Sequence, residues 1–317
     1  MRMAPHRRSM AAMGLMGLTL LMGVAAAHVA RAAARDTYLP PSVCANASTP
    51  STCVHWRPVD AWTGRPFAVM TLALRVGPAS AGVTTYAAWI RTSRSDLALF
   101  PGYKGPGDTT LPRGPEMVPP ASTSTLLATF NSGFYEADGA AGFFTHGTLY
   151  FPMVKGLATV VRYRDGRVDV LDWTAGARPP SNVVMARQNL PLLVSGARAT
   201  PLSTVNAKWG LTLHGVPAVW RTALGVDARG NLIYAAAPNQ TAASLASIMV
   251  RLGAVRAMEL DINPEWPIFV TYAARGAQGP SLFVPNPNQI PTRFLYSSTK
   301  DFFAVFVSTQ PGAAQPW

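Results

Sequence analysis

Short apolar runs rich in β-branched and aromatic residues, each ended by a turn signal, constrain this chain most. Residues 158–163 and 168–173 are two such runs, and Asp165-Gly166 lies between them. Asp-Gly between β-rich runs is a strong hairpin signal, because both residues tolerate the left-handed backbone of a tight turn. Residues 222–226 and 232–236 repeat this arrangement around a second turn. The pattern predicts a chain made mostly of strands and hairpins.

One later segment changes to the period of a helix. Thr241 is a residue type that caps helix N-termini, and Gly253 is typical of a helix end. The apolar positions between them are Leu245, Ile248, Met249 and Leu252. Their spacing places them on one helical face. We therefore predict an α+β fold, mostly β-strands and hairpins in a mixed sheet with a few packed helices.

The first 35 residues predict export. Arg2, Arg7 and Arg8 precede an uncharged stretch, residues 9–30, that consists mostly of Ala, Leu, Met and Gly. Small residues then follow at the positions that a signal peptidase reads. We predict a signal peptide over residues 1–34, and hence a secreted, periplasmic or cell-envelope protein with no stable membrane span after cleavage. An uncleaved anchor is the alternative, since a run of this length can just cross a bilayer.

The rest of the chain divides into two predicted parts. Residues 35–120 form an N-terminal arm and strands packing on the main domain, residues 121–317. Hydrophobic residues make up 49% of the chain and charged residues 13%, which favours a sizeable core. The formal net charge is +12, so acidic glycans, phosphates or membranes are plausible partners. No nucleic-acid recognition motif accompanies the charge, and we predict no nucleic-acid partner.

The two cysteines, Cys44 and Cys53, lie nine apart in a segment rich in Pro, Ser and Thr. In an oxidising compartment we expect them to pair and close a short loop. A zinc site would need more ligands than His55, the one histidine nearby. We predict no metal and no cofactor, although the acidic residues discussed below could hold a hard cation such as calcium.

Three polar segments stand among apolar neighbours and are candidate ligand-binding sites. Asn131, Gly133 and Tyr135 suggest a turn that exposes backbone amides beside an aromatic ring, or an ordinary turn. Arg187 and Asn189 follow an apolar run and could bind a ligand or form a solvated strand end. The third is Arg221, at the head of an apolar strand. A buried guanidinium there needs a carboxylate or an anionic ligand.

A fourth segment, residues 258–266, is the most acidic. Glu259 and Asp261 are two apart at the end of a predicted strand, so we expect them to share a face. Paired carboxylates can divide the roles of acid, base and nucleophile in glycoside cleavage. The candidate catalytic residues are Asp261, Glu259 and Glu265. Asn263 and Trp266 are candidate substrate contacts, because an indole can stack on a sugar ring.

Together these segments resemble the phosphodiester glycosidase family over roughly residues 120–310. Residues 131–135 are similar to the family's Asn-Gly-Gly-Phe-Phe segment. Residues 221–225 are similar to its Arg-Thr-Ala-(small)-Gly stretch, and residues 252–254 to its Leu-Gly-Ala turn. Residues 257–261 match its Ala-x-x-Leu-Asp strand. The family continues Leu-Asp-Gly-Gly-Gly-Ser, whereas Ile262-Asn263-Pro264-Glu265 follows Asp261 here.

The resemblance implies an uncovering-enzyme-like domain of the bacterial exopolysaccharide-related branch, similar to N-acetylglucosamine-1-phosphodiester alpha-N-acetylglucosaminidase. The implied reaction is hydrolysis of a sugar-1-phosphodiester at the glycosidic carbon, with a carbohydrate or glycan phosphodiester as substrate. Arg221 and Arg187 would then provide the cation over the phosphate, and Asp261 with Glu259 or Glu265 the carboxylate near the anomeric carbon. The altered loop favours an alternative, a non-catalytic glycan-binding or envelope-assembly protein on the same fold.

Overall fold

The computed structural model describes residues 38–44, 53–59, 67–76, 82–210, 215–272 and 279–308. The chain divides into two compact units, Met1–Leu39 and Pro40–Trp317, and everything below concerns the second. The predicted signal peptide, residues 1–34, and its expected cleavage region lie outside the described residues. Within the described ranges, no helix combines the length and apolar character needed to cross a bilayer.

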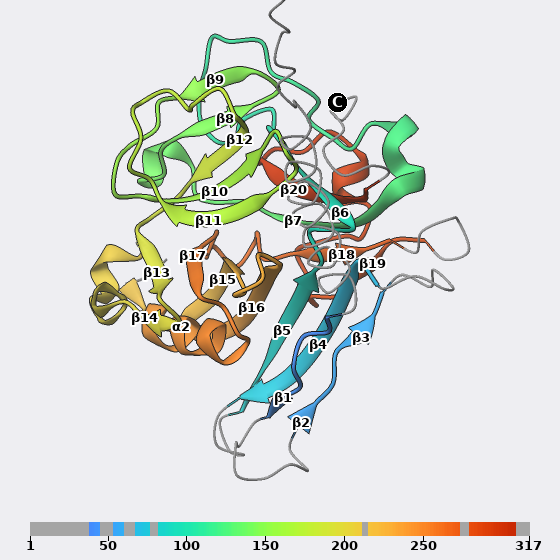
Figure 1. The fold of residues 1–317 in the computed structure, drawn as a ribbon, viewed down its shortest axis with the longest axis vertical. Helices are drawn as coiled ribbons and strands as arrows, with labels where there is room; N and C mark the ends of the chain where they lie inside the picture. The colour runs from blue at the N-terminus through green and yellow to red at the C-terminus, as the bar shows by residue number, and fades with distance from the viewer. Residues whose placement is uncertain are drawn as a thin grey trace, which may run out of the picture. The chain divides into compact units, whose positions relative to one another are not determined.

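The largest sheet has eight strands in the order β14-β13-β17-β15-β16-β5-β4-β3 (Figure 1). Their bounds, in that order, are Arg198–Ala199, Leu192–Ser195, Arg256–Glu259, Val219–Val226, Leu232–Gln240, Val83–Ile90, Val69–Val76 and Arg57–Pro58. The predicted hairpin of β15 and β16 is confirmed. Asp227 closes its turn, since one carboxylate oxygen accepts hydrogen bonds from the backbone N–H groups of Arg229 and Asn231, at 2.8 and 2.9 Å.

A second sheet has five strands in the order β11-β10-β12-β8-β9. Their bounds are Val168–Asp172, Ala158–Tyr163, Val183–Gln188, Phe143–Thr145 and Thr148–Phe151. The hairpin predicted from Asp165-Gly166 is confirmed as β10 and β11. Gly166 has a φ of 84°, the left-handed conformation that the turn requires and that glycine adopts without steric cost.

A third sheet orders its five strands β19-β18-β7-β20-β6. Their bounds are Ser281–Leu282, Phe269–Thr271, Leu126–Asn131, Phe302–Val307 and Ser95–Phe100. The last strand, β20, inserts between β7 and β6, and Phe302 lies opposite both Asn131 and Phe100. This pairing brings the residues just before β20 to the end of β7.

One α-helix, α2 (Ala242–Arg251), occurs among the described residues. Thr241 caps it as predicted, accepting a hydrogen bond from the backbone N–H of Ser244 at 3.2 Å, and the four predicted apolar positions are buried. The remaining helical pieces are single 3₁₀ turns. They are η2 Pro120–Thr125, η3 Glu136–Asp138, η4 Pro201–Thr204, η5 Asn206–Lys208 and η7 Arg293–Leu295.

The prediction of an α+β fold with a mixed sheet and a few packed helices is therefore wrong. The structure is a β-rich fold of several antiparallel sheets, and each strand pairing in the described ranges is antiparallel. The physical reason lies in the connections. Tight turns return the chain antiparallel, whereas a parallel pair needs a crossover of a dozen or more residues, usually helical.

An aromatic cluster joins the third sheet to the eight-stranded sheet. The rings of Phe130, Tyr234, Phe269 and Phe303 have centroids 5.1–5.7 Å apart where they contact, and all four are buried. Each fully buried aromatic side chain contributes about 1.5–3 kcal/mol to folding. The Tyr234 hydroxyl also donates to Asn131 Oδ1 at 2.9 Å, so this core fixes a candidate site residue.

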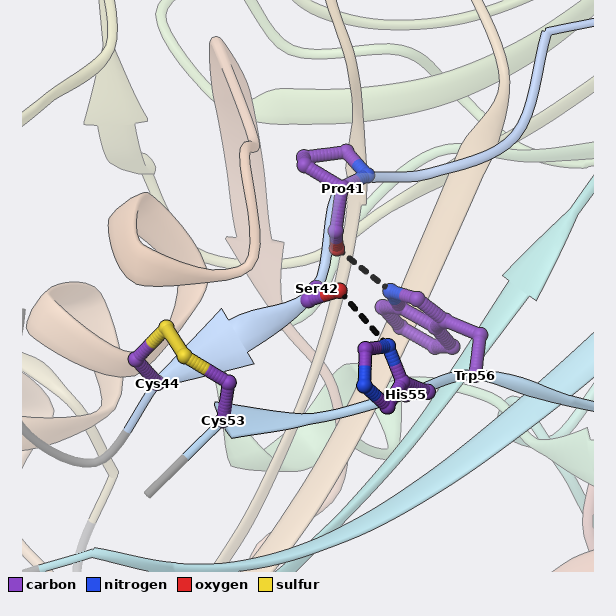
Figure 2. The surroundings of a disulfide bond; sticks show 6 residues. All are labelled: Pro41, Ser42, Cys44, Cys53, His55 and Trp56. Carbon is purple, nitrogen blue, oxygen red and sulfur yellow. Dashed lines mark hydrogen bonds between the residues drawn. A yellow bond between two sulfur atoms is a disulfide. The ribbon is translucent and has the colours of Figure 1, made fainter. Parts of the chain in front are cut away.

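The predicted disulfide Cys44–Cys53 is confirmed (Figure 2). It joins two short paired strands, β1 (Val43–Cys44) and β2 (Cys53–Val54). Next to it, the indole N–H of Trp56 donates to the carbonyl of Pro41 at 2.9 Å, and Ser42 Oγ lies 2.8 Å from His55 Nδ1. These bonds fasten the N-terminal arm to itself around one buried tryptophan.

Candidate active site

A small recess lies where three stretches far apart in sequence meet. One stretch ends β7, the second follows β17, and the third runs from η7 to the start of β20. The lining residues are Asn131, Ser132, Asp261, Trp266, Ile268, Arg293, Phe294, Lys300 and Asp301. The recess is small and partly open, with about 220 Å³ of space that includes the open solvent at its mouth. Only a small part of a ligand fits among these side chains.

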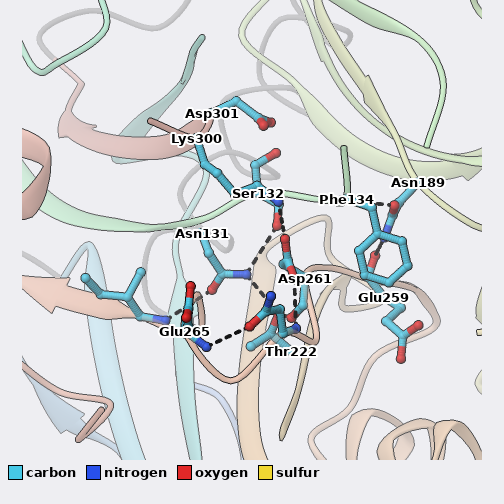
Figure 3. A network of polar contacts seen from close by, with 12 residues as sticks. Asn131, Ser132, Phe134, Asn189, Thr222, Glu259, Asp261, Glu265, Lys300 and Asp301 are labelled. Atoms are coloured by element: carbon cyan, nitrogen blue, oxygen red, sulfur yellow. Dashed lines mark hydrogen bonds and ion pairs between the residues drawn. The ribbon is translucent and has the colours of Figure 1, made fainter. Parts of the chain in front are cut away.

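Asp261 is one of two carboxylates that line this recess, and Figure 3 shows it among its polar neighbours. Its backbone N–H donates to the carbonyl of Ser132 at 3.1 Å, and its own carbonyl accepts from Thr222 Oγ1 at 2.7 Å. Its side chain accepts from the backbone N–H of Asn263 at 2.9 Å and forms an ion pair with Lys300. Burial raises the pKa of the Asp261 carboxyl, and the Lys300 ammonium opposes that shift.

Lys300 lies between two aromatic rings. Its Nζ is 4.1 Å from the ring centroid of Tyr135 and 5.5 Å from that of Trp266. Both contacts are within cation–π range. Burial raises the pKa of the Tyr135 phenol to about 12, and the nearby carboxylates of Asp301 and Asp261 add to the rise. Tyr135 therefore stays protonated and can act as a hydrogen-bond donor.

Asp301 is a second buried carboxylate on the recess. Its Oδ2 accepts from Arg187 Nε at 2.9 Å, and both side chains are fully buried. Arg187 also donates to the carbonyls of Phe134 and Gln188, each at 2.6 Å. Arg187, predicted to contact substrate, thus reaches the recess only through Asp301.

Arg293 is a cation on the recess that forms no ion pair with a carboxylate among the described residues. It lies half-buried on the recess, with its guanidinium carbon 4.9 Å from the Trp266 ring centroid and 5.9 Å from that of Phe294. Burial lowers its pKa, and the phenols of Tyr135 and Tyr103 and the carboxylate of Glu265 partly offset that shift. Its guanidinium, which keeps its charge at any physiological pH, is therefore available to an anionic ligand.

Glu259 and Arg221 form a separate, fully buried ion pair. Arg221 also donates to the carbonyls of Gln240 and Trp209, at 2.9 and 3.1 Å. Burial raises the pKa of the Glu259 carboxyl to about 8, against the opposing effect of Arg221. Neither residue lines the recess.

The expectation that Glu259 and Asp261 share a face is wrong, because β17 ends at Glu259 and the alternation of a strand stops there. Figure 3 shows the two carboxylates pointing in different directions.

The other predicted site residues either shape the recess or lie beside it. Asn131 and Trp266 line it. Asn189 donates to the carbonyl of Glu259 at 2.7 Å and accepts from the N–H of Phe134. Gly133 packs against Asn189, since a Cβ at Gly133 would lie 3.2 Å from the Asn189 side chain.

Glu265 and Asn263 belong to the turn after Asp261. Asn263 Oδ1 accepts from the backbone N–H of Glu265 at 3.0 Å, which shapes that turn. Glu265 is exposed and does not line the recess, so the predicted catalytic trio is not brought together.

Sequence reasoning missed Ser132, Arg293, Lys300 and Asp301. A signal for the last two was present, because Lys300-Asp301 directly precedes an apolar run that starts at Phe302. Arg293 has no comparable signal in a proline- and asparagine-rich stretch.

The glycine- and proline-rich segment beside the recess is a fixed wall. Arg113 donates to the carbonyls of Gly102 and Gly105, both at 2.7 Å, and to that of Gly107 at 2.5 Å. The N–H groups of Lys104 and Gly105 donate to the carbonyl of Thr299, at 3.0 and 2.8 Å. A Cβ at Gly102 would lie 2.3 Å from that same carbonyl oxygen, so no larger residue fits.

Comparisons with known proteins show a shared fold and no family. No family model and no curated protein matches the chain. Among solved structures, it is similar to the catalytic domain of zebrafish N-acetylglucosamine-1-phosphodiester alpha-N-acetylglucosaminidase auto-inhibited by its pro-peptide. The TM-score is 0.50 and the identity 15%, over 80% of this chain and 88% of the other.

A hypothetical protein from Synechocystis is also similar, with a TM-score of 0.42 and 12% identity, over 76% of this chain and 62% of the other. At 15% identity, the likeness to the zebrafish domain establishes the fold alone. The chain therefore shares its fold with a glycosidase catalytic domain.

Proposed function

We propose that this protein is an exported hydrolase that cleaves the glycosidic bond of a sugar-1-phosphodiester in an envelope or exopolysaccharide glycan. One observation carries the proposal: two carboxylates, two cations and a partly buried indole share one small recess. The fold common to this chain and a phosphodiester glycosidase domain supports it, as do the disulfide and the predicted signal peptide, which suit an oxidising compartment.

Each lining group has a role in this chemistry. Arg293 would bind the phosphate oxygens through the two-pronged geometry of its guanidinium. Trp266 would pack against the sugar ring. Asp261, paired with Lys300, would stabilise positive charge as it develops at the anomeric carbon, or accept a proton from the attacking water.

The leaving group lowers the demand on the site. When the bond between the anomeric carbon and the phosphate oxygen breaks, the electron pair stays with the phosphate, which departs as a monoester on its acceptor. A phosphate is stable as an anion, so the departing oxygen needs no strong acid beside it. One well-placed carboxylate and one cation can therefore perform the reaction.

In this proposal three residues have a role that differs from the sequence prediction: Arg221, Glu259 and Arg187. Their side chains pair with partners inside the protein, at 0% exposure. We assign them structural roles: the Arg221–Glu259 pair supports the end of β17, and Arg187 orients Asp301. Arg293 takes the phosphate-binding role.

The decisive experiment is hydrolysis in H₂¹⁸O. The purified mature protein would be incubated with methyl phosphodiesters of the α-1-phosphates of glucose, galactose, mannose and N-acetylglucosamine. Glycosidic cleavage places ¹⁸O on the anomeric carbon and releases methyl phosphate. Label in the phosphate would identify a phosphoesterase and refute the proposal.

A second function, binding a glycan without turnover, has its own support. Both side-chain oxygens of Asp261 are already occupied, one by the N–H of Asn263 and one by Lys300. The glycine-rich continuation expected after Asp261 is absent, and it is the segment that would let backbone approach a substrate closely. Saturable binding of the same diesters with no labelled product would identify this function.

A further inference from the structure

Two buried polar atoms on the recess have no hydrogen-bond partner among the described residues. They are Ser132 Oγ and Asp301 Oδ1. Both residues line the recess, and their exposures are 1% and 1%. Buried polar side-chain atoms in folded proteins are nearly always hydrogen-bonded, because leaving one unsatisfied is costly. Two such atoms on lining residues of one small recess are candidate contacts for a polar group of a ligand.

The protein holds Asp301 in place without satisfying it. Arg187 donates a hydrogen bond to the other oxygen, Oδ2, at 2.9 Å, and is itself held by hydrogen bonds to backbone carbonyls. The Gly102–Gly107 loop packs closely against this carboxylate, since a Cβ at Gly105 would lie 3.0 Å from Asp301 Oδ1. The free oxygen therefore has a fixed position and can only accept a hydrogen bond.

Ser132 complements it. A serine hydroxyl both donates and accepts, whereas an ionised carboxylate only accepts. A ligand group that meets both must donate to Asp301 while it accepts from, or donates to, Ser132. A sugar hydroxyl satisfies this requirement. A phosphate does not, because its oxygens would face the carboxylate charge.

We infer that Ser132 and Asp301 form a specificity subsite that recognises one hydroxyl group of the donor sugar. The inference rests on the proposed function, or on its glycan-binding form, and adds the orientation of the substrate. The sugar hydroxyl lies on the Asp301 side of the recess and the phosphate on the Arg293 side. Asp261 lines the same recess and forms an ion pair with Lys300, the residue next to Asp301.

Calorimetric binding tests this inference without requiring turnover. The wild type would be titrated with the α-1-phosphates of glucose, galactose, mannose and N-acetylglucosamine, then with each monodeoxy analogue of the tightest binder. Loss of the recognised hydroxyl should weaken binding about 10- to 100-fold, since hydrogen bonds to charged groups are among the stronger ones. The other deoxy positions should have much smaller effects.

Ser132→Ala is the informative variant. Because Ser132 Oγ has no hydrogen-bond partner among the described residues, removing it should leave the melting temperature within about 1 °C of the wild type. Affinity for the parent sugar phosphate should fall about fivefold, the equivalent of one neutral hydrogen bond. Affinity for the analogue that lacks the recognised hydroxyl should not change.

Ser203→Ala is the matched control. Ser203 is also buried, at 2% exposure, but its hydroxyl donates to the carbonyl of Thr200 at 2.7 Å and it does not line the recess. This variant should melt lower and bind like the wild type. Asp301→Asn should abolish the discrimination between parent and deoxy analogue, although it also removes the partner of Arg187.

Equal affinity for all monodeoxy analogues, equal losses of parent and analogue in Ser132→Ala, or no binding of any sugar phosphate would each overturn the inference. The proposed hydrolysis is judged separately by ¹⁸O incorporation. Hydrolysis without deoxy discrimination would overturn the subsite alone. Discrimination without hydrolysis would keep the subsite and overturn the enzyme.

Discussion

The substitution Asp261→Asn would test the site and its energetics together. The side chain keeps its size and can still accept the hydrogen bond from the N–H of Asn263. Its amide, however, replaces a negative charge opposite Lys300, whose side chain is 6% exposed. The variant therefore leaves a buried ammonium without its counter-charge.

The expected loss of stability follows from that burial. Removing one member of a buried ion pair costs about 3–5 kcal/mol. For a domain of this size each kcal/mol lowers the melting temperature by about 2–4 °C, so we expect a decrease of about 6–20 °C. Turnover of a sugar-1-phosphodiester should fall at least about a hundredfold, as on loss of an acid–base group.

The double variant Asp261→Asn/Lys300→Met separates the two effects. Methionine fills the space of the lysine stem without a charge, and exchanging a buried ion pair for uncharged groups is often nearly neutral. The double variant should therefore regain most of the lost stability and remain inactive. Melting temperature and ¹⁸O incorporation would be measured on the same preparations.

Asp165→Asn is the matched control, because Asp165 pairs with Arg167 on the surface, at side-chain exposures of 59% and 62%. It should lower the melting temperature by no more than about 2 °C. An Asp261→Asn variant that melts and turns over like the wild type would refute both the energetic and the catalytic role of Asp261.

Three other predictions follow from the charges and the cross-link. The pKa of Glu259, raised to about 8 from 4.5, means that the folded state retains a proton that the unfolded state releases, so stability should fall as pH rises from about 5 to 8. Glu259→Gln should flatten this dependence of the urea midpoint, and parallel profiles would contradict it. Arg293→Lys should weaken binding of a hexose 1-phosphate about tenfold because the two-pronged contact is lost; unchanged calorimetric affinity would exclude that role. Replacing Cys44 and Cys53 by Ser should cost about 2–3 kcal/mol and leave turnover intact, and denaturant unfolding with an unchanged midpoint would contradict the stabilising role.

Local signals predicted the local structure well. The Asp165-Gly166 turn gave the β10–β11 hairpin, Thr241 gave the start of α2, and the two cysteines gave the disulfide. Each of these depends on residues close together in sequence, where backbone preferences and short-range geometry decide the outcome.

Long-range pairing explains what the sequence alone did not predict. Asp261 was found from its place at a strand end, but its partner Lys300 is brought to it by β20 pairing with β7. Arg221 was rightly expected to need an anionic partner. Glu259 from the neighbouring strand β17 provides it, which no local pattern distinguishes from an anionic ligand.

The insertion of β20 has a consequence for how the recess comes into being. β20 pairs with β7 and β6, strands from far earlier in the chain, and Lys300 and Asp301 immediately precede it. Pairings between such distant segments carry a large loop-closure cost and form slowly. Because synthesis proceeds from the N-terminus, the chain can carry the other two stretches of the recess before this strand is made. Binding activity should therefore appear only after β20 has paired with β7 and β6.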